Sequence, residues 1–143
     1  SSLALKRMIN GELRGTSVTA VLIGSQTFAR TWVKYEILKS LERGNKLLGI
    51  HINSIRGKDG LMKLHGRDPF EYLAVMPTSD TTYQCLEYSY TSWREFAELP
   101  SITASGISGC TFRNSYKLSQ FQDINVYDWV RDNGHSNFAS WIA

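Results

Sequence analysis

Glu36 is the side chain in this sequence whose type and setting most suggest chemistry. It lies one helical turn after Trp32, in the stretch 31-TWVKYEILKSLERG-44. A carboxylate held in a ligand crevice can stabilise positive charge that develops in a transition state. A glutamate at helical spacing, with Lys39 close by, is however more often a solvated surface charge. Spacing alone therefore leaves both interpretations of Glu36 open.

The elements around Glu36 form an alternating pattern of helices and strands. The sequence predicts a helix over 3–13, a strand over 18–24, a helix that ends near Arg43, and a strand over 47–52. The run VTAVLIG at 18–24 is almost wholly apolar, which suits a strand covered on both faces. Helices and strands that alternate with short links indicate an α/β domain with a parallel sheet.

The helix that carries Glu36 is expected to begin at the mouth of a ligand crevice. Thr27 or Thr31 can cap its start, directly after the first strand. In open α/β sheets, ligands bind outside the carboxyl ends of the strands, where helix amino ends attract anions. Ser25 lies at this strand end and Arg30 at the helix start. Glu36 is expected in the second turn, beside the row of side chains that faces the sheet.

The rest of the chain has a less regular pattern, and we treat all 143 residues as one domain. The later elements expected, in order, are a loop over 56–69, a strand over 83–90, one or two helical turns over 92–99, a loop over 101–119, a strand or short helix over 123–130, and a closing helix that contains Phe138, Trp141 and Ile142.

Composition argues against several classes of protein. The net charge of +3 is small and its basic residues are scattered, whereas nucleic-acid binders usually carry a clustered patch. No apolar run approaches the ~20 residues of a membrane span. Cys85 and Cys110 lack the spacing of a metal site or a disulfide framework, so two free thiols in a reducing cytoplasm are expected. His51, His65 and His135 show no catalytic spacing, and we expect His51 to be a hydrogen-bonded strand histidine.

The segment 17–52 resembles the TIR domain pattern of an apolar strand, a serine at its tip, W-x-x-x-E on the next helix, and a second apolar strand. Ser25 matches the serine, and Trp32 and Glu36 match the W-x-x-x-E positions. The whole chain is more closely similar to the TIR-like proteins of the bacterial Thoeris anti-phage system. This similarity is carried by ALKRMINGELRGTSVTAVLIGSQTF (4–28), DPFEYL (68–73) and VYDWVRDNGHSNFASWIA (126–143).

The resemblance implies a flavodoxin-like TIR fold with a parallel sheet and flanking helices, and a family-specific part from about residue 54. It implies an enzyme that takes NAD as its substrate, with no bound cofactor or metal, and in which Glu36 is essential. Cleavage of the nicotinamide–ribose bond and formation of a cyclic ADP-ribose isomer would give a messenger that activates a separate effector, ThsA. The family's first strand and first helix have no counterpart here, so we expect them to precede residue 1 in the intact protein.

Three residues near Glu36 are candidates for substrate contacts. Ser25 could hydrogen-bond a ribose or the nicotinamide amide, or merely cap a helix. Arg30 could meet the pyrophosphate, or be an exposed arginine without a ligand. Trp32 could line the pocket or pack beneath Glu36, and the usual burial of aromatic side chains favours packing.

Two other functions compete with the enzyme. A TIR module could act by self-association or by docking to another TIR domain, with Glu36 in a structural role. A receiver-like domain could bind phosphate or a nucleotide, but it needs an acidic cluster at the strand ends. The strand ends here are Gly24-Ser25 and Asn53-Ser54, which disfavours a receiver.

Overall fold

A three-stranded parallel sheet carries the part of the fold that the sequence predicted best. β1 (Val18–Ile23) and β2 (Lys46–His51) pair in parallel along their whole length. β8 (Asn125–Asp128) pairs in parallel with the other side of β2, so the strand order is β1-β2-β8. Both predicted strands are confirmed, and the segment 123–130 contains a strand rather than a short helix.

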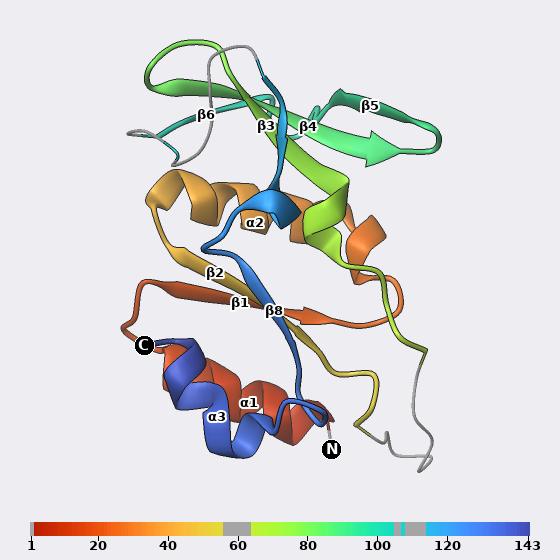
Figure 1. Ribbon diagram of the computed structural model, residues 1–143, viewed down its shortest axis with the longest axis vertical. Coiled ribbons are helices and arrows are strands. Elements are labelled where there is room, and N and C mark those ends of the chain that lie inside the picture. The colour runs from red at the N-terminus through yellow and green to blue at the C-terminus, as the bar shows by residue number, and fades with distance from the viewer. Residues whose placement is uncertain (1, 56–63, 105–106, 108–113) are drawn as a thin grey trace.

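Four layers follow one another in the computed structural model (Figure 1). α1 (Ser2–Leu13) and α3 (Gly134–Trp141) cover one face of the parallel sheet. α2 (Thr31–Arg43) covers the opposite face, and a second sheet lies on the far side of α2. The parallel sheet with helices on both faces confirms the predicted flavodoxin-like α/β class. The residues that the structure describes are 2–55, 64–104, 107 and 114–143.

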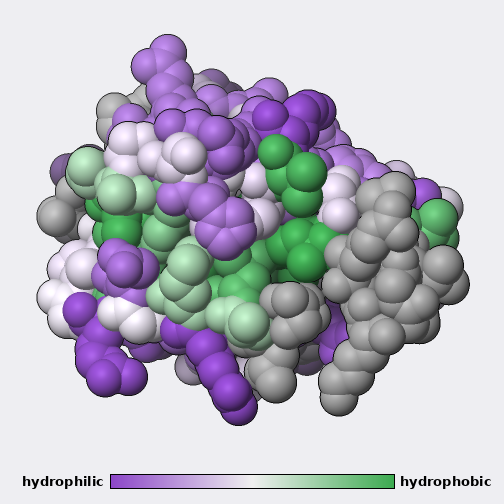
Figure 2. All heavy atoms as spheres, turned by 90° about the horizontal axis from the view of Figure 1, so that it is seen from below, coloured by the Kyte–Doolittle hydropathy of each residue, from purple (hydrophilic) through white to green (hydrophobic). Residues whose placement is uncertain are grey.

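The layer of α1 and α3 packs on the sheet through an apolar core. The fully or nearly buried members of this core are Leu5, Ile9, Leu48, Ile50, Trp129, Phe138 and Trp141. Figure 2 views the molecule from the side of α1 and α3 and shows apolar atoms gathered on its surface. Met8 and Val130, which are 36% and 55% exposed, line a hollow of about 500 Å³ there. Its lining is mainly apolar, so it offers few of the polar groups that orient a nucleotide.

The second sheet is antiparallel and was not predicted as a sheet. Its strand order is β5-β4-β3-β7, with β6 also paired to β4. Its strands are β3 (Leu73–Pro77), β4 (Thr82–Ser89), β5 (Ser92–Glu95), β6 (Ser101–Thr103) and β7 (Tyr116–Lys117). The short 3-10 helix η2 (Pro69–Tyr72) precedes the first of these strands, and η3 (Leu118–Gln120) follows the last. The strand predicted over 83–90 is confirmed as β4. The helical turns predicted over 92–99 are wrong, and the segment 101–119, predicted as a loop, contains β6, β7 and the first two residues of η3.

A tight hairpin explains why the segment after β4 is a strand. Tyr90 adopts a left-handed backbone with φ of 58°, which turns the chain back on itself. Trp93 in β5 then lies opposite Tyr88 in β4, and their rings meet edge to face with centroids 5.5 Å apart. Cross-strand aromatic pairs of this kind stabilise antiparallel strands.

α2 is held between the two sheets. Ile37 is fully buried in the core that lies between them. On the side of the parallel sheet, the Ser40 hydroxyl donates a hydrogen bond to the hydroxyl of Thr19 in β1 at 2.9 Å. On the other side, the ammonium of Lys34 donates to the Glu87 carboxylate of β4 at 2.8 Å, with both side chains buried. We expected α2 to face one sheet only, so this second buried face is a correction.

The described chain also bears on the thiols and on membrane contact. Cys85 lies in the core between the sheets, and burial, with a smaller effect of the Glu42 charge, raises the pKa of its thiol to about 12. Cys110 lies outside the described residues.

In the described parts of the chain, every helix is too short or too polar to cross a bilayer.

Candidate active site

The turn from β1 into α2 is held by the side chain of Thr27. Its hydroxyl oxygen accepts a hydrogen bond from the N–H of Gly24 at 2.8 Å, and the hydroxyl donates to a carbonyl of β1 at 3.4 Å. The short helix η1 (Thr27–Ala29) follows, and Arg30, with an extended backbone, occupies the position before α2. The prediction that Thr27 or Thr31 caps α2 is therefore wrong.

The amino end of α2 is suited to an anion. No side chain caps it, so the first backbone N–H groups stay available to a ligand. The helix dipole places partial positive charge at the same end. The exposed side chain of Arg30 adds a full positive charge beside it. These groups match the needs of a phosphate or pyrophosphate.

The carboxylate of Glu36 is exposed and has no partner among the residues that the structure describes. Glu36 precedes Ser40 by one helical turn, and Ser40 contacts β1, so Glu36 lies on the side of α2 above β1. Within the described parts of the chain, no strand pairs with the other edge of β1. No described residue donates a hydrogen bond to the Glu36 carboxylate or forms an ion pair with it.

Trp32 and Ser25 are both exposed near this start of α2. Trp32 is 68% exposed, and its ring stacks on that of Tyr35 with centroids 5.0 Å apart and an interplanar angle of 3°. The expectation that Trp32 packs beneath Glu36 is therefore wrong, while its role as a substrate contact stays a prediction. Ser25 lies in the exposed turn after β1 and caps no helix. The structure thus places Ser25, Arg30, Trp32 and Glu36 on exposed positions from the end of β1 to the second turn of α2.

A pair of histidines that the sequence did not predict lies at the carboxyl end of β2. His51 is 7% exposed, and its ring stacks on that of His65 with centroids 4.0 Å apart. His65 Nδ1 lies 3.2 Å from Asn53 Oδ1, whereas His51 Nδ1 has no hydrogen-bond partner among the described residues. Burial and then the nearby His65 lower the pKa of His51, against an opposing effect of Asp128. The expectation of a hydrogen-bonded His51 is wrong at Nδ1.

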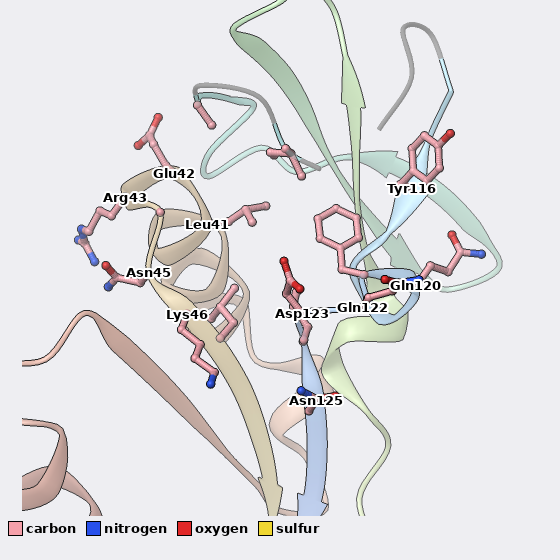
Figure 3. A pocket seen from close by; sticks show the side chains of 16 residues that line it. Leu41, Glu42, Arg43, Asn45, Lys46, Tyr116, Gln120, Gln122, Asp123 and Asn125 are labelled. Carbon is pink, nitrogen blue, oxygen red and sulfur yellow. The ribbon is translucent and has the colours of Figure 1, made fainter. Parts of the chain in front are cut away.

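A wider hollow lies at the opposite end of α2. It measures about 1070 Å³ and opens at the amino ends of β2 and β8 (Figure 3). Two of the charged groups that line it are already engaged: Glu42 accepts from Lys39 at 2.8 Å and from the N–H of Thr103 at 2.9 Å, and Lys46 donates to the carbonyl of Ala143 at 2.8 Å. Ligands of open α/β sheets bind at the carboxyl ends of the strands. We therefore place the candidate site near Glu36 and not in this hollow.

Two comparisons identify the family of the chain. Residues 1–56 match the family model described as Thoeris protein ThsB, TIR-like domain. The chain is also 47% identical, over 144 residues, to a protein of Bacillus cereus (strain MSX-D12) named "Putative cyclic ADP-D-ribose synthase ThsB1". That alignment covers 99% of this chain and 74% of the relative. The chain therefore belongs to the ThsB family of TIR-like proteins from Thoeris systems.

Proposed function

We propose that this protein cleaves the nicotinamide–ribose bond of NAD and closes the remaining ADP-ribose into a cyclic isomer, which serves as a messenger in phage defence. The observation that carries the proposal is the 47% identity, over 99% of the chain, to a relative named for cyclic ADP-D-ribose synthesis. The messenger would act on a separate effector protein, ThsA. The exposed carboxylate of Glu36, near the start of α2, supports the same conclusion, because a carboxylate can stabilise positive charge on the ribose.

The reaction requires one group that stabilises a sugar cation. When the bond from ribose C1′ to nicotinamide breaks, its electron pair passes to the pyridinium nitrogen, which becomes neutral. Nicotinamide therefore leaves without a proton, and positive charge develops on the ribose. A single carboxylate can stabilise that charge, as one of the two does in glycoside hydrolysis, and no second acid is needed. Glu36 suits this role because no described residue neutralises its charge.

The neighbouring groups can bind the rest of the substrate. Arg30 and the uncapped amino end of α2 suit the pyrophosphate. The exposed ring of Trp32, already stacked on Tyr35, offers a flat surface to an aromatic base. The exposed hydroxyl of Ser25 would hydrogen-bond a ribose hydroxyl or the nicotinamide amide. Cyclisation then requires a nucleophile of the same molecule to reach C1′ before water does.

The test is NAD turnover by the intact protein, with and without lysate from phage-infected cells. Nicotinamide and nucleotide products are measured by mass spectrometry. Glu36→Gln is expected to lower nicotinamide release about 10²- to 10³-fold, the usual cost of removing one charge-stabilising group. Glu12→Gln, which changes an exposed helical glutamate of α1 on the opposite face of the sheet, is the matched control and should retain full activity.

Two results would count against the proposal in different ways. Equal turnover by Glu36→Gln and the parent would show that Glu36 is not catalytic. No nicotinamide release by the parent under either condition would favour the alternative of a TIR module that acts through assembly or docking. Adding the products to ThsA then separates messenger synthesis from simple depletion of NAD.

A further inference from the structure

The segment Leu64–Arg67, called the strap below, crosses the carboxyl ends of β1 and β2. Its third residue, Gly66, is buried against the end of β1. A Cβ atom added at Gly66 would overlap the carbonyl oxygen of Gly24 and would lie 3.3 Å from the Cα of Ser25. The strap is therefore in backbone contact with the strand end that carries the proposed substrate residue Ser25.

The neighbours of Gly66 fix the strap at two further points. The ring of His65 stacks on that of His51 with centroids 4.0 Å apart, which joins the strap to the end of β2. The guanidinium of Arg67 lies 5.3 Å from the centroid of the Phe28 ring and donates a hydrogen bond to the Tyr72 hydroxyl at 2.9 Å. Since Phe28 belongs to η1 and Tyr72 to η2, Arg67 joins the strap to both short helices.

The strap lies along one side of the candidate site and leaves the other side open. Gly66 is buried, whereas Ser25, Arg30 and Glu36 all remain exposed. The described residues of the strap therefore form a wall at the strand ends and leave these three side chains accessible. A nucleotide that reaches Ser25 from the open side of β1 would have this wall behind it.

We propose that the strap determines product specificity, because it shields the ribosyl cation from water and so favours cyclisation over hydrolysis. This inference rests on the proposed function. After the C1′–nicotinamide bond has broken, attack by a group of the same molecule gives the cyclic isomer, and attack by water gives linear ADP-ribose. When the attacking group is water or a hydroxyl of the same molecule, its proton passes to solvent as the new bond to C1′ forms. Both products follow one cleavage step, so the strap changes their ratio and leaves nicotinamide release unchanged.

The test uses His65→Ala and Arg67→Ala in the intact protein, which loosen the two anchors without introducing a clash. The ratio of linear to cyclic product is expected to rise about twofold to tenfold, the factor that the loss of one ring-stacking or cation–π contact produces. Nicotinamide release should stay at the parent rate. His135→Ala is the matched control: His135 is also an exposed histidine in ring contact, with Trp129, but it lies on α3 away from the strap.

Gly66→Ala is a second, independent perturbation, because its methyl group displaces the strap from Gly24. It should raise the linear product at least as much as the anchor variants, and a thermal unfolding curve shows whether it is folded. An unchanged ratio in His65→Ala and Arg67→Ala would overturn the role of the strap. So would a loss of nicotinamide release in folded variants, because the strap would then act on cleavage. Absence of nicotinamide release in the parent would instead overturn the proposed function, so the two failures are distinguishable.

Discussion

The buried ion pair between Lys34 and Glu87 makes a quantitative prediction about how α2 is attached to the antiparallel sheet. The two charged groups are 2.8 Å apart, and their side chains are only 6% and 8% exposed. Removing one partner of a buried pair leaves the other charge unpaired, which typically costs about 3–5 kcal/mol. Glu87→Leu is therefore expected to lower the free energy of unfolding by about that amount. For a domain of this size the unfolding midpoint would fall by roughly 6–20 °C.

The two single variants should differ because Glu87 has a second partner. The Arg94 guanidinium lies 3.2 Å from the other Glu87 oxygen and is 55% exposed at its side chain. Lys34→Met leaves Glu87 paired with Arg94, so its cost is expected to be lower, about 1–3 kcal/mol. The double variant replaces the pair by apolar groups and is expected to recover most of the loss, to within about 1 kcal/mol of the parent.

Urea unfolding of the parent, both single variants and the double variant completes a double-mutant cycle. Lys39→Met is the control on the same helix: Lys39 also pairs with a glutamate at 2.8 Å, but its side chain is 29% exposed, so the midpoint should stay near that of the parent. The reasoning is refuted if Glu87→Leu is no more damaging than Lys39→Met. It is also refuted if the double variant is as unstable as the sum of the two single losses.

Two further predictions concern pH and packing. Burial and His65 lower the pKa of His51 below its ordinary 6.5, so His51 takes up a proton at higher pH in the unfolded chain than in the native protein. The contribution of neutral His51 to the free energy of unfolding is therefore full above about pH 6.5 and falls as the pH drops toward the lowered native pKa. Below that pKa the contribution no longer changes with pH. Urea unfolding at several pH values should show this decline, and a decline that is the same in His51→Gln would contradict it. Gly134→Ala should destabilise the protein by about 1–3 kcal/mol, because the new Cβ would overlap the buried Trp129 ring. Gly11→Ala in α1 meets nothing within 4 Å and should instead stabilise by about 0.5–1 kcal/mol, so equal effects of the two substitutions on thermal unfolding would show that the packing argument is wrong.

The unit around Glu36 was predictable because its signals are local. The apolar run of β1, the four-residue spacing that buries Ile37, and the glycine that ends α2 all lie within short windows of the sequence. Gly44 does adopt the left-handed backbone, with φ of 75°, that the predicted helix end requires. The position of Glu36 beside the buried row follows from the same periodicity. Its catalytic role stays a prediction, since spacing does not distinguish a catalytic carboxylate from a solvated one.

The second sheet could not be predicted because long-range contacts decide it. The alternation in β4 correctly placed Cys85 and Glu87 on one face. That this face is the buried one depends on Lys34, which lies 53 residues earlier and neutralises Glu87. All four residues of β5 are exposed, so no buried face reveals this strand in the sequence. Trp32 was misjudged for a related reason, because the usual burial of tryptophan does not hold where Tyr35 supplies a stacking partner at the surface.

The position of α2 between two sheets has a consequence for how the proposed activity could be switched on. Rotating or sliding this helix would disturb two closely packed interfaces at once, and protein interiors resist such shifts. Glu36 should therefore keep a constant orientation whether or not nucleotide is present. A dormant and an active form would then share the same α2, and control would act on the access of NAD to its carboxylate.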